Sequence, residues 1–136
     1  MGEHQTAVDA LVDSARQLIA RVRPADVVGF LGGDGVLVDI RPHAQRVREG
    51  EVPGAVVIER NVLEWRLDPA APTCVALARQ GWEPVVVMCS EGYASSLAAA
   101  ALVSLGRPNV ADLAGGFRAW RDEGLPTVVG GTPAIP

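Results

Sequence analysis

The chain has 136 residues, of which 49% are hydrophobic and only 4% aromatic, so it is long enough for one domain with an aliphatic core. All 12 cationic side chains are arginines, which excludes lysine mechanisms such as Schiff-base formation. The formal net charge of −4 argues against nucleic-acid binding, which would need a basic surface.

The redox and membrane signals point to a cytoplasmic protein. Two cysteines are too few for a disulfide framework, and the first residues lack the basic start and apolar run of a secretory signal. The longest uncharged, mostly apolar stretch is 93–105, which is too short to span a bilayer. We therefore expect no membrane partner and no nucleic-acid partner.

The beginning of the chain is predicted to be helical. Apolar residues at helical spacing predict an amphipathic helix over 6–22, and Pro24 separates it from a second short helix over 25–31. We expect 1–23 to pack as a helix on a domain that spans 24–126.

Short apolar strands and helices alternate along the rest of the chain. Strands are predicted at 36–40, 55–58, 85–88 and 109–113, with helices or helical turns at 61–67, 73–80, 95–105 and 117–123. Residues 42–50 form a polar loop or a short helix, and the Gly- and Pro-rich segment 127–136 is expected to be a flexible tail. This alternation predicts an α/β fold with a parallel sheet covered on both faces.

Several reactive or charged residues follow these strands. Asp39 and Arg41 stand at the end of the first predicted strand, Arg60 follows the second, and Cys89 follows the third. Because the carboxyl ends of parallel strands share one edge of the sheet, we expect these residues on a common rim where ligands bind.

The segment after Cys89 has the features of an anion-binding turn. A short strand-to-helix turn points backbone N–H groups inward, and the helix N-terminus adds partial positive charge, so the nucleophilic thiolate is favoured. The same cradle suits a persulfide. Gly92 permits the tight turn, and the hydroxyls of Ser90 and Ser95 are expected donors, with Ser95 also a candidate helix cap. Cys74 lies in a helical pattern and is expected to be a buried core residue.

Residues 89–95, Cys-Ser-Glu-Gly-Tyr-Ala-Ser, resemble the active loop of the rhodanese-like family, in which Cys, Gly and Ser follow each other with two residues between them. Three more segments resemble the family in the right order, and they lie at 37–41, 50–55 and 113–126. Together they cover about 24–126. The resemblance implies a three-layer α/β domain with a central five-stranded parallel sheet flanked by helices, and a reaction without metal or organic cofactor.

The resemblance also implies a sulfurtransferase. Cys89 would take a sulfane sulfur from a small donor such as thiosulfate, hold it as a persulfide, and pass it to a thiol or cyanide acceptor; a sulfur-relay protein is a further candidate partner. Asp39 and Arg41 are expected to support the loop. The substrate would be bound by the loop residues Ser90, Glu91, Gly92, Tyr93, Ala94 and Ser95.

Two positions depart from the family pattern. Glu51 stands where the family usually has His, and we expect a structural role for it. Ala94 stands where many active members have Arg, so the loop has no cation of its own and Glu91 adds a negative charge. The missing charge could come from neighbouring strand ends, where the candidates are Arg41, Arg60 and Arg66. The alternative for each of these three arginines is that it is a solvated surface group.

Other readings of the cysteine loop remain open at this point. A phosphatase loop would need Arg at position 95, which is Ser here. A Cys–His hydrolase would need His4 or His43 as its base, and the two cysteines and two histidines have no zinc-ligand spacing. The strongest rival is a non-enzymatic rhodanese-like module that binds a protein or carries a sulfur, and Ala94 and Glu91 favour it.

Overall fold

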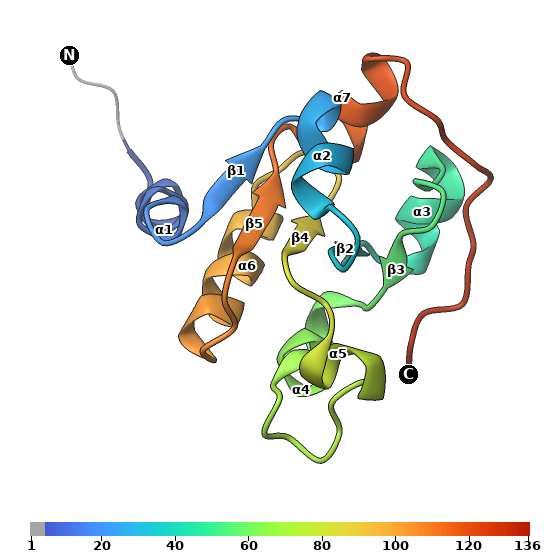
Figure 1. Cartoon of the computed structure of the whole chain (residues 1–136). Helices are drawn as coiled ribbons and strands as arrows, with labels where there is room; N and C mark the ends of the chain where they lie inside the picture. Colours follow the sequence, from blue (N-terminus) through green and yellow to red (C-terminus); the bar gives the residue numbers. More distant parts are fainter. Residues whose placement is uncertain (1–4) are drawn as a thin grey trace.

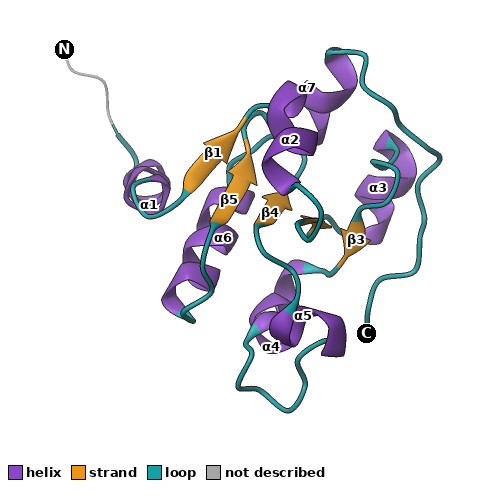
Figure 2. Ribbon diagram, viewed as in Figure 1, coloured by secondary structure: helices purple, strands orange, loops and turns teal. Residues whose placement is uncertain are grey.

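Five parallel strands form the centre of the molecule, a computed structural model that describes residues 5–136 (Figures 1 and 2). Their order in the sheet is β1-β5-β4-β2-β3, and every neighbouring pair is parallel. The strands are β1 (Ala20–Val22), β2 (Val36–Asp39), β3 (Val56–Val57), β4 (Val85–Met88) and β5 (Val110–Leu113). The predicted parallel α/β sheet is confirmed. His4, considered above as a base, lies outside the described residues.

Helices cover both faces of the sheet. One face carries α4 (Leu63–Leu67), α5 (Ala76–Gln80) and α6 (Ala94–Ser104), and the other carries α2 (Val27–Leu31) and α7 (Gly116–Asp122). Helix α1 (Ala7–Arg16) packs against α6, and α3 (His43–Glu49) connects β2 with β3. Two short 3-10 turns, η1 (Pro24–Asp26) and η2 (Arg60–Val62), precede α2 and α4. Within the described residues, no helix is both long enough and apolar enough to cross a membrane.

The central strand β4 shows why the sequence needs two helical layers. All four of its residues are buried; Val85 and Val87 belong to one core cluster, and Val86 and Met88 belong to the other. Side chains alternate between the faces of a strand, so a strand that is apolar at every position must be covered on both sides.

The predicted helix over 6–22 is wrong in its second half. Thr6 caps α1 by accepting a hydrogen bond from the Asp9 N–H, but the helix ends at Arg16, and Ala20–Val22 form β1. Apolar residues in this segment satisfy either period, and the ladder with β5 decides in favour of a strand. The segment before Pro24 therefore supplies the fifth strand of the sheet.

The predicted helix over 73–80 is also shorter than expected. Only its second half, α5, is helical, and Cys74 lies in the preceding loop. Its thiol donates to the Val75 carbonyl, and its side chain is buried in the core, as expected.

The C-terminal segment 127–136 returns to the domain after α7. Val128 pairs with Glu51, the Thr132 carbonyl accepts from Arg46, and the Ile135 N–H donates to the Val57 carbonyl. These contacts place the segment beside α3 and β3.

Glu51 holds this segment in place. Its carboxylate accepts hydrogen bonds from Arg46 Nη1 (2.7 Å), from the backbone N–H groups of Gly131 (3.0 Å) and Thr132 (3.2 Å), and from the Thr132 hydroxyl (2.6 Å). Burial alone would raise the pKa of Glu51, but the bonds from Thr132 and Arg46 outweigh it, so the pKa lies below its ordinary value. The departure from His at this position therefore coincides with a buried ion pair.

Replacing Glu51 with Gln is expected to lower the free energy of unfolding by about 1–3 kcal/mol at pH 7, because charge-assisted hydrogen bonds to a buried group are lost. A carboxyl whose pKa is lowered by folding stabilises the protein above its unfolded pKa, near 4.5, and this contribution disappears as the pH falls through the folded value. Urea unfolding of both proteins at pH 7 and at lower pH measures the effect. A difference that does not shrink in acid would contradict the assignment.

Candidate functional site

Three strands of the sheet deliver polar or reactive residues to its carboxyl edge. Asp39 ends β2, Cys89 follows β4 directly, and Asp112 is the third residue of β5. Both carboxylates are fully buried, and Cys89 retains 7% exposure. The predicted rim exists, and β5 contributes a carboxylate that sequence reasoning did not include.

The loop after β4 wraps around the Cys89 sulfur. Cys89 Sγ accepts hydrogen bonds from the backbone N–H groups of Gly92 (3.1 Å) and Ser95 (3.3 Å). The second donor lies in the first turn of α6, an 11-residue helix, so the sulfur lies at a helix N-terminus. Both contacts favour negative charge on the sulfur.

Gly92 is required by this geometry. Its φ is +89°, a conformation that residues with a Cβ rarely adopt. A Cβ at this position would also lie 2.8 Å from the Gly115 nitrogen. Helix α7 thus begins directly against the loop, where the N–H groups of Phe117 and Arg118 donate to the Cys89 and Ser90 carbonyls.

Three other N–H groups of the loop remain available. Those of Glu91, Tyr93 and Ala94 have no acceptor among residues 5–136, and all three residues are exposed. In the five successive residues 91–95, each N–H group therefore either contacts Cys89 Sγ or has no acceptor among the described residues.

The two serine hydroxyls point elsewhere than predicted. Ser90 Oγ donates to both carboxylate oxygens of Glu49 (2.8 Å each), and Ser95 Oγ donates to Asp112 (2.9 Å). Ser95 is also not the helix cap, because Tyr93 occupies that position without a side-chain hydrogen bond. Each hydroxyl is drawn to a carboxylate, which is a stronger acceptor than a thiol sulfur. The serines therefore fasten the loop to the domain, while main-chain N–H groups contact the sulfur.

Asp39 and Arg41 form a fully buried ion pair with Arg41 Nη2 2.7 Å from Asp39 Oδ2. Arg41 Nη1 also reaches Glu49 (3.1 Å), the residue that holds Ser90, and the guanidinium lies 4.3 Å from the centre of the Phe117 ring. Arg41 is wholly enclosed, so the expectation that it could bind a substrate is wrong. Its contact to the loop runs through Glu49, which accepts from Ser90, and the loop-supporting role stays a prediction.

Charge interactions keep this cluster ionised. Burial alone would lower the pKa of Arg41, but hydrogen bonds and charge from Asp39 and Glu49 raise it above its ordinary value. Burial alone would raise the pKa of Glu49, but the bonds from Ser90 and Arg41 lower it. The Ser90 anchor is therefore an ionised carboxylate at neutral pH.

Arg60 and Arg66 have partners away from the loop. Arg60 pairs with Glu64 at 2.7 Å, and Arg66 donates to the carbonyl of Pro136. Among the described contacts, none joins either residue to 89–95. His43 begins α3, is exposed, and lies beside Gly131 of the C-terminal segment.

The structure brings other arginines to the loop. Arg16 of α1 and Arg21 of β1 both donate to the Gly92 carbonyl, and Arg118 of α7 reaches Glu91 (3.3 Å) and Glu49 (3.5 Å). Arg118 is 48% exposed, and Glu91 is 60% exposed. Sequence reasoning missed Arg16 and Arg21 because the segment that carries them was taken for a single helix.

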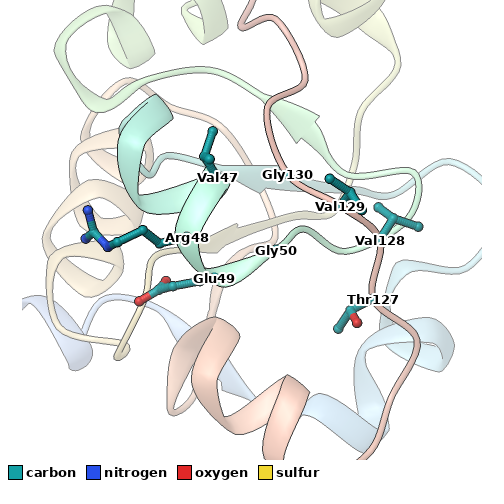
Figure 3. A pocket seen from close by; sticks show the side chains of 8 residues that line it. All are labelled: Val47, Arg48, Glu49, Gly50, Thr127, Val128, Val129 and Gly130. Atoms are coloured by element: carbon teal, nitrogen blue, oxygen red, sulfur yellow. The ribbon is translucent and has the colours of Figure 1, made fainter.

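A shallow surface hollow borders the loop anchor (Figure 3). Figure 3 shows Arg48 and Glu49 extending away from the C-terminal segment, while Val128 and Val129 lie on that segment. Glu49 belongs both to this lining and to the Ser90 anchor. Among residues 5–136, no group of three His, Cys, Asp or Glu side chains is placed to hold a metal ion.

Comparison with known proteins defines the class. The model of the rhodanese-like domain family matches residues 15–123. The thiosulfate sulfurtransferase GlpE of Stutzerimonas stutzeri is 32% identical over 102 residues, which cover 74% of this chain and 84% of that protein. The chain therefore belongs to the rhodanese-like domain family.

Solved structures agree with this assignment. A Rhodopseudomonas palustris protein of unknown function, described as a possible tyrosine phosphatase, is 33% identical with a TM-score of 0.82, over 93% of this chain and 99% of that one. A polysulfide-sulfur transferase homodimer of Wolinella succinogenes is 27% identical with a TM-score of 0.65, over 88% and 85%. A thiosulfate sulfurtransferase of Pseudomonas aeruginosa is 25% identical with a TM-score of 0.67, over 85% of this chain and 20% of that one. The predicted family and three-layer fold are confirmed.

Replacing Arg41 with Gln is expected to destabilise the protein by about 3–5 kcal/mol, because the buried Asp39 and Glu49 lose their counter-charge. Arg60→Gln is the matched control: its pair with Glu64 is only partly buried, so its loss is expected to cost about 1 kcal/mol or less. Denaturant unfolding of both variants measures the two values. Equal losses would show that the Arg41 cluster does not support the fold.

Proposed function

We propose that this chain is a sulfurtransferase that carries a sulfane sulfur as a persulfide on Cys89. The observation that carries the proposal is the pair of main-chain N–H groups, from Gly92 and Ser95, that donate to Cys89 Sγ at the start of α6. They favour the thiolate, which is the nucleophile. The names of the thiosulfate and polysulfide-sulfur transferase relatives support the same chemistry.

The reaction has two half-reactions. With thiosulfate, the Cys89 thiolate attacks the outer sulfur, the bond between the two sulfur atoms of thiosulfate breaks, and sulfite leaves with the electron pair. Cyanide or a small thiolate then attacks the terminal sulfur of the persulfide. With cyanide, thiocyanate is released and the Cys89 thiolate is regenerated, and no redox or organic cofactor takes part in either half-reaction.

The loop stabilises both anionic forms of Cys89. A persulfide places its charge one atom further from the backbone than the thiolate does. The N–H groups of Glu91, Tyr93 and Ala94, which lack acceptors among the described residues, are the donors that would bind this outer sulfur. In this proposal, residues 90–95 bind the substrate through their main-chain N–H groups. The side chains of Tyr93 and Glu91 lie on the exposed side of the loop.

A phosphatase is less well supported, although one structural relative is described as a possible tyrosine phosphatase. A phosphate ester needs a cation beside the nucleophile to balance its charge. Position 95 carries Ser, whose hydroxyl donates to Asp112, and the nearest arginines contact the Gly92 carbonyl instead. Hydrolysis of p-nitrophenyl phosphate by the wild type, absent in Cys89→Ser and without sulfur loading, would reverse this preference.

A sulfur carrier or protein-binding module remains the second candidate, favoured by the charge at the loop. Glu91 is exposed at the entrance, and Ala94 provides no cation to attract a small dianion. Such a module would receive sulfur from a protein and would not turn over free thiosulfate. Its setting would be cytoplasmic, where thiols stay reduced.

Intact-mass measurement after incubation with thiosulfate, and in parallel with polysulfide, tests the proposal. Wild type and Cys74→Ser are expected to gain one sulfur atom that cyanide removes, and Cys89→Ser is expected to gain none. Cys74 is the matched control because it is the other free cysteine of the described chain and is buried, with its thiol donating to the Val75 carbonyl. If polysulfide alone loads Cys89, thiosulfate is not the donor. If neither donor loads it, the sulfurtransferase proposal fails and the module takes its place.

Replacing Glu91 with Gln is expected to raise kcat/KM for thiosulfate about threefold to tenfold, because a negative charge leaves the Cys89 loop and Arg118 loses one of its two carboxylate partners. Glu123→Gln removes the same charge at the exposed end of α7 and is expected to change nothing. Steady-state assays at low ionic strength compare them. An equal rise in kcat/KM in both variants would show that the effect comes from the net charge of the protein and not from the position of Glu91.

A further inference from the structure

The N-terminal segment brings two guanidinium groups to one carbonyl of the active loop. Arg16 Nη2 lies 2.8 Å from the Gly92 oxygen, and Arg21 Nη2 lies 3.0 Å from the same atom. These arginines come from α1 and β1, more than 70 residues away in sequence from the loop they contact. A neutral carbonyl with two charged donors is an unusually strongly held part of a loop.

Both arginines are themselves fixed by second partners. Arg16 Nε donates to Ser96 Oγ (3.0 Å), and its guanidinium lies 5.4 Å from the centre of the Tyr93 ring. Arg21 Nε and Nη2 donate to the buried carboxylate of Asp112 at 2.9 and 3.3 Å. Their place at the loop is therefore set by the domain, and they do not behave as solvated surface cations.

The peptide that they hold carries the Tyr93 N–H, which has no acceptor among the described residues. In a planar trans peptide the C=O and the following N–H point in opposite directions. Because the Gly92 carbonyl points to the arginines, the Tyr93 N–H points away from them. The Gly92 and Ser95 N–H groups on either side of this peptide contact Cys89 Sγ. A peptide that rotated would turn the Tyr93 N–H out of the donor array.

We propose that Arg16 and Arg21 are positioning residues of the Cys89 site. They fix the Gly92–Tyr93 peptide so that its N–H joins the donors around the sulfur, and they supply from outside the loop the positive charge that Ala94 does not supply within it. The consequence for sulfur transfer rests on the function proposed above. The effect on the reactivity of the Cys89 thiol is independent of that function.

Other charges surround the same loop and must stay constant in a test. The Arg41–Asp39 pair lies behind Glu49, which holds Ser90 from α3. The other charged or titratable groups that belong to the loop or contact it are Glu91, Tyr93, Asp112 and Arg118. None of these is altered in the variants chosen below.

The experiment measures the rate of Cys89 alkylation by iodoacetamide as a function of pH, in the full chain carrying Cys74→Ser. The variants are Arg16→Gln, Arg21→Gln, the double variant and the control Arg23→Gln. Arg23 is a matched control because its side chain is 77% exposed and pairs with Asp26 on the surface. We expect the double variant to react about tenfold more slowly at neutral pH, with its profile moved to higher pH, as the loss of charge-assisted bonds predicts. Arg23→Gln should match the parent protein.

Two further variants separate positioning from folding. Arg16→Lys keeps the charge and a donor, so it is expected to recover part of the rate lost in Arg16→Gln. Arg16→Gln also leaves the Arg21–Asp112 pair in place, so it tests the proposal even if Arg21→Gln fails to fold. A parent-like rate and pH profile in Arg16→Gln would overturn the proposal, whatever happens to its melting temperature.

Sulfur loading of the same proteins distinguishes the two proposals. If the parent protein accepts no sulfur from thiosulfate or polysulfide but its alkylation profile still depends on Arg16 and Arg21, the function proposed above fails and the positioning role stands. If the parent protein loads sulfur and the variants match it in rate and profile, the positioning role fails alone.

Discussion

The contact between Cys89 Sγ and the N–H groups of Gly92 and Ser95 is the interaction on which the rest of this structure depends. A thiol sulfur is a weak hydrogen-bond acceptor and a thiolate is a strong one, so a loop that aims several main-chain donors at one sulfur favours its anion. The loop can do this because β4 ends at Met88, directly before Cys89, α6 begins at Ala94, and Gly92 adopts a positive φ between them. The start of α7 packs directly against Gly92, and residues of α1, β1, α3 and α7 form hydrogen bonds or ion pairs with the loop.

Two ionic networks fasten the loop from different sides. In the first, Arg41 and Asp39 reach it through Glu49 and Ser90. In the second, Asp112 accepts from the hydroxyls of Ser95 and Ser96 and is paired with Arg21, which holds the Gly92 carbonyl together with Arg16. In each case the charged group contacts a carbonyl or a hydroxyl of the loop, while uncharged main-chain N–H groups contact the sulfur. In the function proposed above, the charge of these groups would reach the Cys89 site through the backbone, in place of an Arg at position 94.

The sequence predicts those parts of the molecule whose structure depends on residues close together in the chain. An apolar strand followed by Cys, a Gly and a helix start predicts the Cys89 loop, and alternating elements predict the parallel α/β sheet. The failures have a shared cause, which is that partners distant in the sequence decide the outcome. Residues 20–22 become a strand because β5 offers a ladder, and the Ser90 and Ser95 hydroxyls turn to carboxylates from α3 and β5. Arg60 follows a strand and was expected at the site, yet it pairs with Glu64 instead. Asp112 lies near the carboxyl end of β5 and was overlooked, although the same argument applies to it.

The most direct test of this account is the NMR response of the loop amides when Cys89 takes up sulfur. Spectra of the ¹⁵N-labelled protein would be recorded reduced and after loading with polysulfide, with Gly106 at the far end of α6 as an internal reference. The account predicts downfield amide proton shifts for Tyr93, Ala94 and Glu91, whose N–H groups gain an acceptor, with Gly106 unchanged. Loaded protein in which these three amides keep their shifts would contradict the claim that the main chain of this loop holds the transferred sulfur.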